Sequence, residues 1–231
     1  MQREIGKGLD RLKEIAAAHP NSAPIQQLLG QWYARAGNLA ESQKAFEKAK
    51  AADPNFVAAD LSLVEVDLRE GRNAAARQKL TSVLAAAPTN VPALLLAARA
   101  DDAAGDHAAA VARYRAVLGV DGANLVALNN LAYMLATDNP DEALKFAQQA
   151  AERAPESPYV QDTLGWVYYR KGLYTMAVRC LQTAVDKEAT PRRQFHLGMS
   201  YLKAGDQING QKIVRLALQK DPNLAKTEQG W

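Results

Sequence analysis

The sequence is poor in cysteine, in aromatic residues and in long apolar runs. Its single cysteine, Cys180, excludes an internal disulfide framework and a zinc site built from cysteines. Aromatic residues make up 6% of the chain, whereas 48% of it is apolar and much of that is alanine. Alanine favours helices and adds little volume, so the composition predicts thin layers of closely packed helices. No apolar run approaches the roughly 20 residues of a membrane-spanning helix.

The sequence also lacks a dense cluster of basic residues. The chain has 28 Lys and Arg against 25 Asp and Glu, for a formal net charge of +3. Basic residues do recur on what we expect to be the outer helices, but acids such as Glu41, Glu47 and Asp53 interleave with them. Such a mixture is typical of a solvated face and argues against nucleic acid as a partner. The basic residues concerned are Lys44, Lys48, Lys50, Arg77, Lys79, Arg113 and Arg115.

What the sequence does have is an internal repeat. A spacing of 34 residues separates the members of two series, one of prolines (Pro20, Pro54, Pro88) and one of glycines (Gly37, Gly71, Gly105). Within each period apolar residues recur at helical spacing, as in Leu164, Val167 and Tyr168. A glycine in the middle of the period predicts the end of one helix, and a proline near its end predicts the end of a second. Each period is therefore a helical hairpin that buries its apolar face against its neighbours.

In its order of residues each period resembles the tetratricopeptide repeat. The first full copy carries the pattern at Leu29, Gly30, Tyr33, Gly37, Ser42, Phe46, Ala49 and Pro54. The resemblance implies an all-α fold, a right-handed superhelical α-solenoid of about six hairpins. We place these at 23–56, 57–90, 91–124, 125–157, 158–190 and 191–224, as one continuous solenoid without a linker. Small residues at Gly30, Gly165, Gly198 and Ala177 allow two helices of a hairpin to approach closely.

Both ends depart from a full repeat. Residues 1–22 form a half-repeat whose helix, over residues 3–19, presents Leu9, Leu12 and Ile15 as an apolar stripe. This helix would be the second of its hairpin, so we expect the chain to be part of a longer array or an upstream neighbour to cover it. Residues 225–231 form a loosely held tail. In the fourth repeat Thr137 to Pro140 replaces the glycine turn, and Asp138 or Asn139 caps the next helix.

The resemblance also implies where a partner binds. In this family the first helices line a concave groove at their second, fifth, ninth, twelfth and thirteenth positions. In the first three repeats these positions are polar and mixed in charge: Pro24, Gln27, Gln31, Arg35, Leu61, Glu65, Arg69, Leu95, Arg99 and Asp102. In the last three they are rich in aromatic residues, and we predict the binding surface there. Its residues are Asn129, Asn130, Tyr133, Asp162, Trp166, Tyr169, Arg170, Arg192, Phe195 and Met199.

Several of these residues could serve packing instead. We expect Trp166 and Tyr169 to be exposed, because Leu164, Val167 and Tyr168 already occupy the buried face of their helix. Tyr159 and Phe195 fit the groove and the core equally well.

Two further patterns bear on the groove. The clamp by which chaperone-binding members hold a C-terminal carboxylate is absent, since Gln27, Gln31, Ser62, Pro92 and Leu96 stand at its positions. Asp67 and Asp101 replace the usual tyrosine, with Arg69 and Arg99 nearby. They form either a ladder of ion pairs or a polar seat for a basic segment.

Catalytic signatures are missing. His19, His107 and His196 have no second ligand at metal spacing on their own helices, and we predict no metal, cofactor or catalytic residue. Cys180 could meet His196 from the next repeat, but a buried inert thiol is the commoner role. Phosphate loops, dinucleotide fingerprints and nucleophile elbows are absent from the sequence. We therefore predict that the chain is not an enzyme.

The sequence thus predicts a scaffold that binds a peptide or a partner protein, without nucleic acid and without inserting into a membrane. Self-assembly, as a dimer or end to end, is the alternative, and nucleic-acid binding a distant third. Residues 128–133 and 162–170 resemble those of bacterial tetratricopeptide proteins of envelope and exopolysaccharide systems. For a bacterial chain this resemblance implies the periplasm or envelope rather than the cytoplasm.

Overall fold

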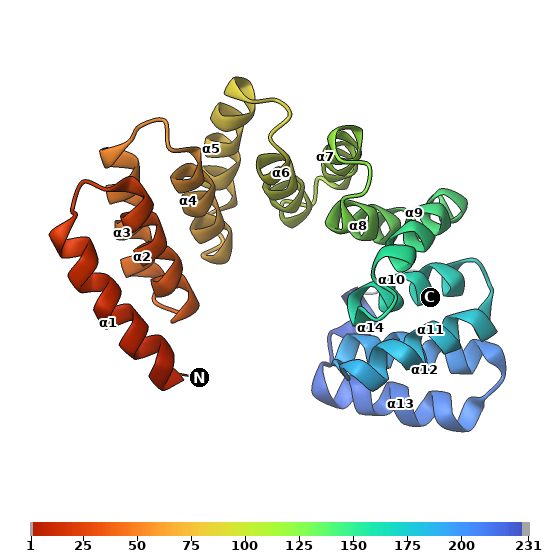
Figure 1. Cartoon of the computed structure of the whole chain (residues 1–231). Coiled ribbons are helices and arrows are strands. Elements are labelled where there is room, and N and C mark those ends of the chain that lie inside the picture. Colours follow the sequence, from red (N-terminus) through yellow and green to blue (C-terminus); the bar gives the residue numbers. More distant parts are fainter. Residues whose placement is uncertain (1, 228–231) are drawn as a thin grey trace. The chain divides into compact units, whose positions relative to one another are not determined.

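The computed structural model describes residues 2–227, and every element in that range is a helix (Figure 1). The first seven are α1 (Gln2–Ala18), α2 (Ala23–Arg35), α3 (Leu39–Ala52), α4 (Val57–Arg69), α5 (Asn73–Ala86), α6 (Val91–Ala103) and α7 (His107–Val120). The others are α8 (Leu125–Leu135), α9 (Pro140–Arg153), α10 (Pro158–Arg170), α11 (Tyr174–Lys187), α12 (Pro191–Ala204), α13 (Gln207–Lys220) and α14 (Leu224–Thr227). No helix among these residues is long and apolar enough to cross a membrane.

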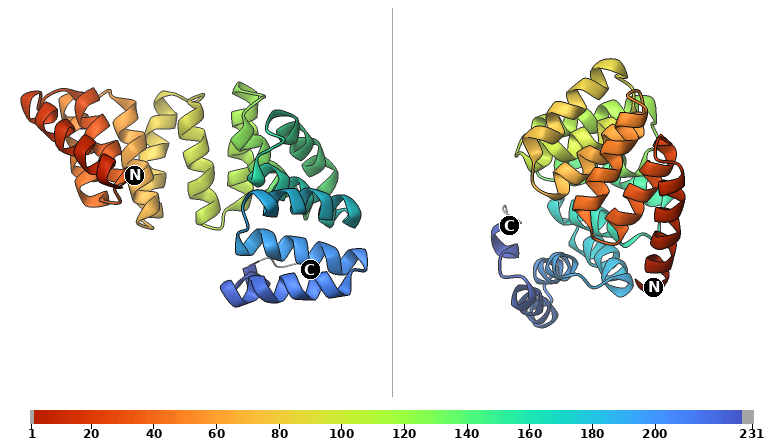
Figure 2. Two further views of the ribbon diagram at one scale, coloured as in Figure 1. Left: turned by 60° about the horizontal axis from the view of Figure 1, so that its bottom comes forward. Right: turned by 90° about the vertical axis from the view of Figure 1, so that its left-hand side faces the viewer.

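Successive helices pack as hairpins. The pairs α2–α3, α4–α5, α8–α9, α10–α11 and α12–α13 are in contact, and each lies within one predicted repeat. Figures 1 and 2 both show α12 and α13 side by side. The predicted all-helical hairpin architecture is therefore confirmed. The chain divides into two compact units, residues 1–116 and 117–231, and the boundary falls inside α7 rather than in a linker.

The turns inside the hairpins follow the expected chemistry. Gly37 and Gly205, like three other glycines at the equivalent turns, have positive φ angles, which glycine adopts without steric cost. At the turn without glycine, the side chain of Asn139 accepts a hydrogen bond from the Glu142 amide, and Pro140 is the first residue of α9. The prediction that Asp138 or Asn139 caps this helix is thus confirmed, with Asn139 as the cap.

Close approach within the hairpins depends on glycine. A Cβ atom on Gly30 would lie 2.4 Å from the ring of Phe46, and one on Gly165 would lie 2.5 Å from Leu181. One on Gly198 would meet backbone, at 2.8 Å from the amide nitrogen of Val214. These three glycines therefore let the two helices of each hairpin come together, as the sequence predicts.

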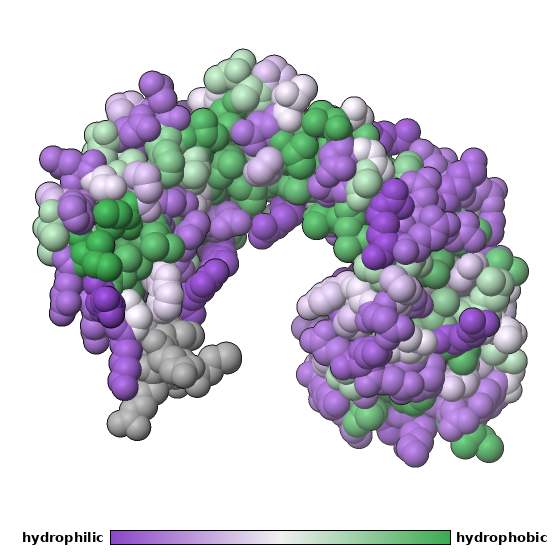
Figure 3. Space-filling view, viewed as in Figure 1, coloured by the Kyte–Doolittle hydropathy of each residue, from purple (hydrophilic) through white to green (hydrophobic). Residues whose placement is uncertain are grey.

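In the first unit the core is a row of small clusters rather than one mass. Leu12 and Ala16 of α1 pack on Leu29 of α2, while Ile15 is 41% exposed. The prediction that Ile15 belongs to the apolar stripe of this helix was therefore wrong. Leu12 and Ala16 are the residues that face α2. A separate cluster joins residues of α4, α5 and α6, including Val64, Leu80 and Leu96. In Figure 3 hydrophobic residues gather over α5 and α6, where alanine and leucine are frequent.

The second unit has a larger and more aromatic core. It contains Trp166, Tyr168 and Tyr169 from α10, Phe195 from α12, and Leu181 from α11. The first residues of the expected tail, 225–227, belong to the single turn α14, which begins at Leu224, the last residue of the predicted sixth repeat; Leu224 is buried in this core. Residues 228–231, the rest of the predicted tail, lie outside the described residues.

Candidate partner-binding surfaces

The aromatic residues of α10 are buried, which corrects the prediction for this helix. Trp166 is 4% exposed and Tyr169 is 5% exposed. All residues from Thr163 to Tyr169 are buried because α10 is in contact with α8, α9, α11 and α12. A helix flanked in this way has no free side in its middle. The reasoning that three other residues already filled the buried face was wrong, because the buried face covers nearly the whole circumference.

Two rings stack on the indole of Trp166. The imidazole of His196 stacks on it with ring centroids 4.3 Å apart, and the phenol of Tyr169 stacks with centroids 5.0 Å apart. Burial raises the pKa of Tyr169, and its hydroxyl has no hydrogen-bond partner among the described residues. Phe195 and Met199 of α12 are also buried, at 0% and 7% exposure. Phe195 thus belongs to the core, and none of these four side chains offers a free surface.

Asp162 binds a residue that the sequence analysis considered only as a metal or catalytic candidate. The Nδ1 atom of His196 lies 2.8 Å from the Asp162 carboxylate and donates to it, which links α12 to α10. His196 is fully buried, and its contacts are structural. A signal was present in the sequence: an acid and a histidine on neighbouring first helices, separated by about one repeat.

The remaining predicted residues of this surface are partly accessible: Asn129, Asn130, Tyr133 and Arg170 are half-buried, and Arg192 is exposed. The guanidinium of Arg192 lies over the ring of Tyr133, 4.4 Å from its centroid, which ties α12 to α8. Arg170 lies 5.8 Å from the centroid of Trp166. Asn130 donates to the carbonyl of Val126 on its own helix rather than pointing to a partner. Asn129 is half-buried and keeps a buried carbonyl oxygen without a partner among the described residues.

Among the described residues of this unit, Tyr159 is the exposed aromatic ring. Its side chain is 64% exposed and lies over the guanidinium of Arg193, 4.4 Å from the ring centroid. Arg193 is itself buried and bonded to Glu188. Sequence reasoning left Tyr159 open between groove and core, and the structure places it at the surface.

The first unit contains a hollow on the inner face of its first helices. It measures about 370 Å³ and lies between α2 and α4. Four predicted groove residues line it, namely Gln31, Arg35, Glu65 and Arg69. Ser62 completes the polar wall, and the buried side chains of Phe46 and Val66 form an apolar floor. The structure thus brings four polar groove positions of the first two repeats together around one hollow. The predicted binding surface, by contrast, was the aromatic one of the last three repeats.

The charged groups of this hollow are unpaired. Arg35, Glu65 and Arg69 are exposed, and none of them has an ion-pair or hydrogen-bond partner within residues 2–227. Next to them the side-chain nitrogen of Gln27 donates to the hydroxyl of Ser62 at 2.7 Å. The oxygen of the same Gln27 amide is buried without a donor among the described residues.

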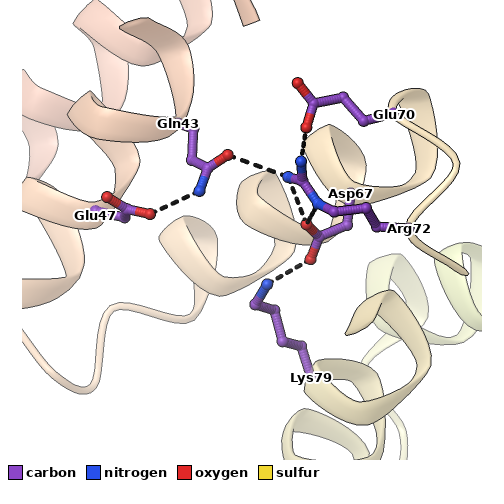
Figure 4. A network of polar contacts seen from close by, with 6 residues as sticks. All are labelled: Gln43, Glu47, Asp67, Glu70, Arg72 and Lys79. Atoms are coloured by element: carbon purple, nitrogen blue, oxygen red, sulfur yellow. Dashed lines mark hydrogen bonds and ion pairs between the residues drawn. The ribbon is translucent and has the colours of Figure 1, made fainter. Parts of the chain in front are cut away.

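Asp67, by contrast, is fully engaged (Figure 4). It is 3% exposed and accepts hydrogen bonds from Arg72, at 2.8 Å from Nε, and from Lys79 of α5. Arg72 also contacts Glu70 and, through a 3.1 Å hydrogen bond, Gln43 of α3. The network therefore joins three helices.

Asp101 repeats this arrangement on α6. It is 5% exposed and pairs with Arg77 of α5 and Arg113 of α7. The two buried acids thus form ion pairs with Lys79, Arg77 and Arg113 on outer helices and with Arg72 in the turn before α5, rather than with Arg69 and Arg99. A polar seat for a basic segment is excluded here because neither carboxylate reaches the groove.

Cys180 has the environment of an inert thiol. It is half-buried on α11, and burial raises the pKa of its thiol, which lowers the fraction of reactive thiolate. Within the described residues no group of three or more His, Cys, Asp or Glu side chains could hold a metal ion.

Comparison with known proteins identifies the repeat. Two tetratricopeptide repeat family models match residues 28–91 and 67–128. A TPR repeat-containing protein of Pseudomonas aeruginosa, PA4667, is 35% identical over 77 residues, which is 32% of this chain and 13% of that protein. The chain thus spans about an eighth of the length of this curated relative.

Solved structures show the same fold at low identity. A chain of the APC/C hetero-tetramer Cut9–Hcn1 superposes with a TM-score of 0.82 at 16% identity, covering 100% of this chain and 46% of that one. The pilF protein of Pseudomonas aeruginosa gives a TM-score of 0.74 at 16% identity, over 96% of this chain and 98% of that one. PilW, a type IV pilus biogenesis factor, gives 0.76 at 14% identity, over 90% and 98%. The fold is that of a tetratricopeptide α-solenoid.

Proposed function

We propose that this chain, which carries tetratricopeptide repeats, binds a partner polypeptide on the inner faces of its first helices, with the hollow between α2 and α4 as the main seat. Tetratricopeptide repeats generally mediate protein–protein interaction and are generally not catalytic. The observation that carries the proposal is the set of unpaired charged side chains around a hollow with an apolar floor. Trp166 and Tyr169 of α10 are closed by packing, whereas the groove residues around the hollow are exposed: Gln31, Arg35, Glu65 and Arg69.

The hollow has the composition of a polypeptide seat. Phe46 and Val66 offer apolar contact at its base, and polar groups surround them, as in the core and rim of an interface. Gln31 is exposed at the wall, and its amide can both donate to a backbone carbonyl and accept from a backbone N–H. An extended segment could therefore be held by its backbone while one side chain lies on the floor.

A second seat is supported by the exposure of Tyr159 in the second unit. Tyrosine and arginine are frequent anchors of interfaces. The accessible members of the predicted aromatic surface, Asn129, Tyr133, Arg170 and Arg192, lie on the same three first helices, α8, α10 and α12. In this proposal the buried Trp166 supports the surface from beneath and does not touch the partner.

Selection from a phage-displayed library of random peptides tests the main seat. Peptides that bind the intact chain should lose affinity for Ser62→Trp, because an indole at this position fills the hollow. Thr81→Trp is the matched control, since Thr81 is exposed on α5, outside the hollow and in the same unit. Equal binding to the intact chain and to Ser62→Trp would exclude the hollow as the seat. Loss of binding in Tyr159→Ser alone would move the seat to the second unit.

Other functions have weaker support. Self-assembly remains the alternative, and the mass in solution at two concentrations would detect it. Nucleic-acid binding is disfavoured because outer-face cations are already paired: Lys44 with Glu41, Lys50 with Asp60, and Lys79 with Asp67. The absence of enzymatic activity and the envelope or periplasmic location stay predictions.

A further inference from the structure

We infer that the hollow between α2 and α4 selects partner segments that carry an acidic side chain, whose carboxylate lies between Arg35 and Arg69. This inference rests on the proposed function and adds the chemistry of the occupant. The two arginines stand 34 residues apart, at equivalent positions of neighbouring first helices, and both line the same hollow.

The balance of charge on this face favours an acid. Arg35 and Arg69 face a single carboxylate in the hollow, that of Glu65, and none of the three is within ion-pair distance of another. On α6, Arg99 is also exposed and unpaired within residues 2–227.

The neighbouring acids are already engaged. Asp60 pairs with Lys50, Asp67 with Arg72 and Lys79, and Asp101 with Arg77. Among the described residues no carboxylate forms an ion pair with Arg35 or Arg69, although the outer-face cations Lys50, Lys79 and Arg77 each have one.

That Arg35 and Arg69 are arginines rather than lysines also favours a carboxylate as the occupant. A guanidinium presents a planar fork of N–H donors that matches a carboxylate in two parallel hydrogen bonds, which an ammonium group does not. Lysine dominates the exposed outer face of α3, whereas the hollow has arginine from both helices. Two forks on adjacent helices can hold one carboxylate from two sides.

The uncharged groups of the wall add donors. Ser62 accepts its hydrogen bond from Gln27, so its own hydroxyl proton is available to the hollow. The buried oxygen of Gln27 has no donor among the described residues, although buried polar groups in proteins are nearly always paired. The Ser62 hydroxyl therefore adds a donor for a carboxylate, whereas the buried Gln27 oxygen is an acceptor that only an N–H or O–H group of the partner can satisfy.

A polypeptide fits this hollow better than a nucleic acid does. The floor of Phe46 and Val66 is apolar, and Glu65 would repel a phosphate backbone. A peptide brings a single carboxylate near Glu65, whereas a nucleic acid brings a phosphate at every nucleotide. An acidic residue flanked by an apolar one is therefore the expected recognition unit.

The test uses the random peptide library on two forms of the full chain. Peptides selected on the intact chain should be enriched in Asp and Glu, and those selected on Arg35→Glu/Arg69→Glu should be enriched in Lys and Arg. A selected acidic peptide should bind the double variant at least about tenfold more weakly, and its Glu→Gln counterpart should lose a similar factor on the intact chain.

The control variant is Lys7→Glu/Lys48→Glu, which changes the net charge equally at two exposed positions away from the hollow. It should bind the selected peptide as the intact chain does, and circular dichroism should show the helical content of the intact chain in both double variants. An equal loss in the control would refute the inference, because the attraction would then be long-range.

The test distinguishes a failure of the inferred acidic selectivity from a failure of the proposed binding function. Peptides that bind in the hollow, are lost in Ser62→Trp and show no acidic enrichment would refute the inference and leave the function standing. Peptides that bind the intact chain and Ser62→Trp with equal affinity would refute both the inference and the proposed seat in the hollow. A single-stranded DNA oligonucleotide that binds through the same two arginines, as tightly as the peptide, would overturn the choice of a polypeptide.

Discussion

Replacing Gly198 by alanine tests how closely the two helices of the last hairpin must pack. Gly198 lies in α12, where it faces α13. A Cβ atom added there would lie 2.8 Å from the amide nitrogen of Val214 and 3.1 Å from the carbonyl oxygen of Gly210. Both neighbours are backbone atoms of α13, so no side chain can rotate to make room. Gly198→Ala must therefore push the two helices apart.

The expected cost is the difference between two effects. Alanine in a helix interior is about 1 kcal/mol more favourable than glycine, which would stabilise the variant. Forcing an extra methyl group into a packed interface costs about 1–3 kcal/mol. The clash with backbone places this variant toward the upper end, so we expect a net destabilisation of about 1–2 kcal/mol.

Urea unfolding followed by circular dichroism measures this change. Gly119→Ala in α7 is the control, because a Cβ atom there meets nothing within 4 Å. The control should be as stable as the parent or slightly more stable, whereas Gly198→Ala should unfold at lower urea. If both variants gained stability, the close approach of α12 and α13 would not depend on glycine and the reasoning would fail.

Three further changes follow from the described contacts. Trp166→Ala should destabilise the second unit by about 3–5 kcal/mol by leaving a cavity, seen as a lower midpoint of unfolding; an unchanged midpoint would show that the indole is not packed. Asp67→Ala should lower the free energy of unfolding by about 1–3 kcal/mol. This is less than the loss of a fully buried ion pair, because the two cations of Asp67 are each about 40% exposed and can be solvated. Asp60→Ala, at a more exposed ion pair, is the matched variant and should lower it less than Asp67→Ala does. Burial raises the pKa of Tyr114 from 10.0 to about 12, so its stabilising effect is complete below pH 10 and is lost as the pH rises toward 12. Tyr114→Phe should therefore flatten the fall of stability with pH in that window, and an unaltered slope would refute this assignment.

The expected loss in Trp166→Ala also changes how binding must be tested. Had Trp166 been exposed, its removal would have reported on the partner alone. Since Trp166 is buried and stacks with His196 and Tyr169, the same substitution perturbs the fold of the second unit. Substitutions at exposed residues, such as Tyr159→Ser and the Arg35/Arg69 pair, separate binding from folding.

The repeat, its register and its turns could be read from the sequence because they depend on local chemistry. Gly37 permits a positive φ wherever the rest of the chain lies, and Asn139 with Pro140 caps a helix within one turn. These preferences act between residues a few positions apart, so a one-dimensional pattern contains them.

Which inner-face residues are free was decided only by tertiary structure. Trp166 and Arg35 both occupy predicted groove positions, yet one is enclosed by four neighbouring helices and the other lines an open hollow. The partners of Asp67, likewise, are Arg72 in the turn before α5 and Lys79 on the outer helix α5, and not Arg69, the arginine nearest in sequence. The exposure and the ion-pair partners of a side chain depend on how many neighbouring helices surround its own helix. That enclosure is a property of the packed chain and cannot be read from any single repeat.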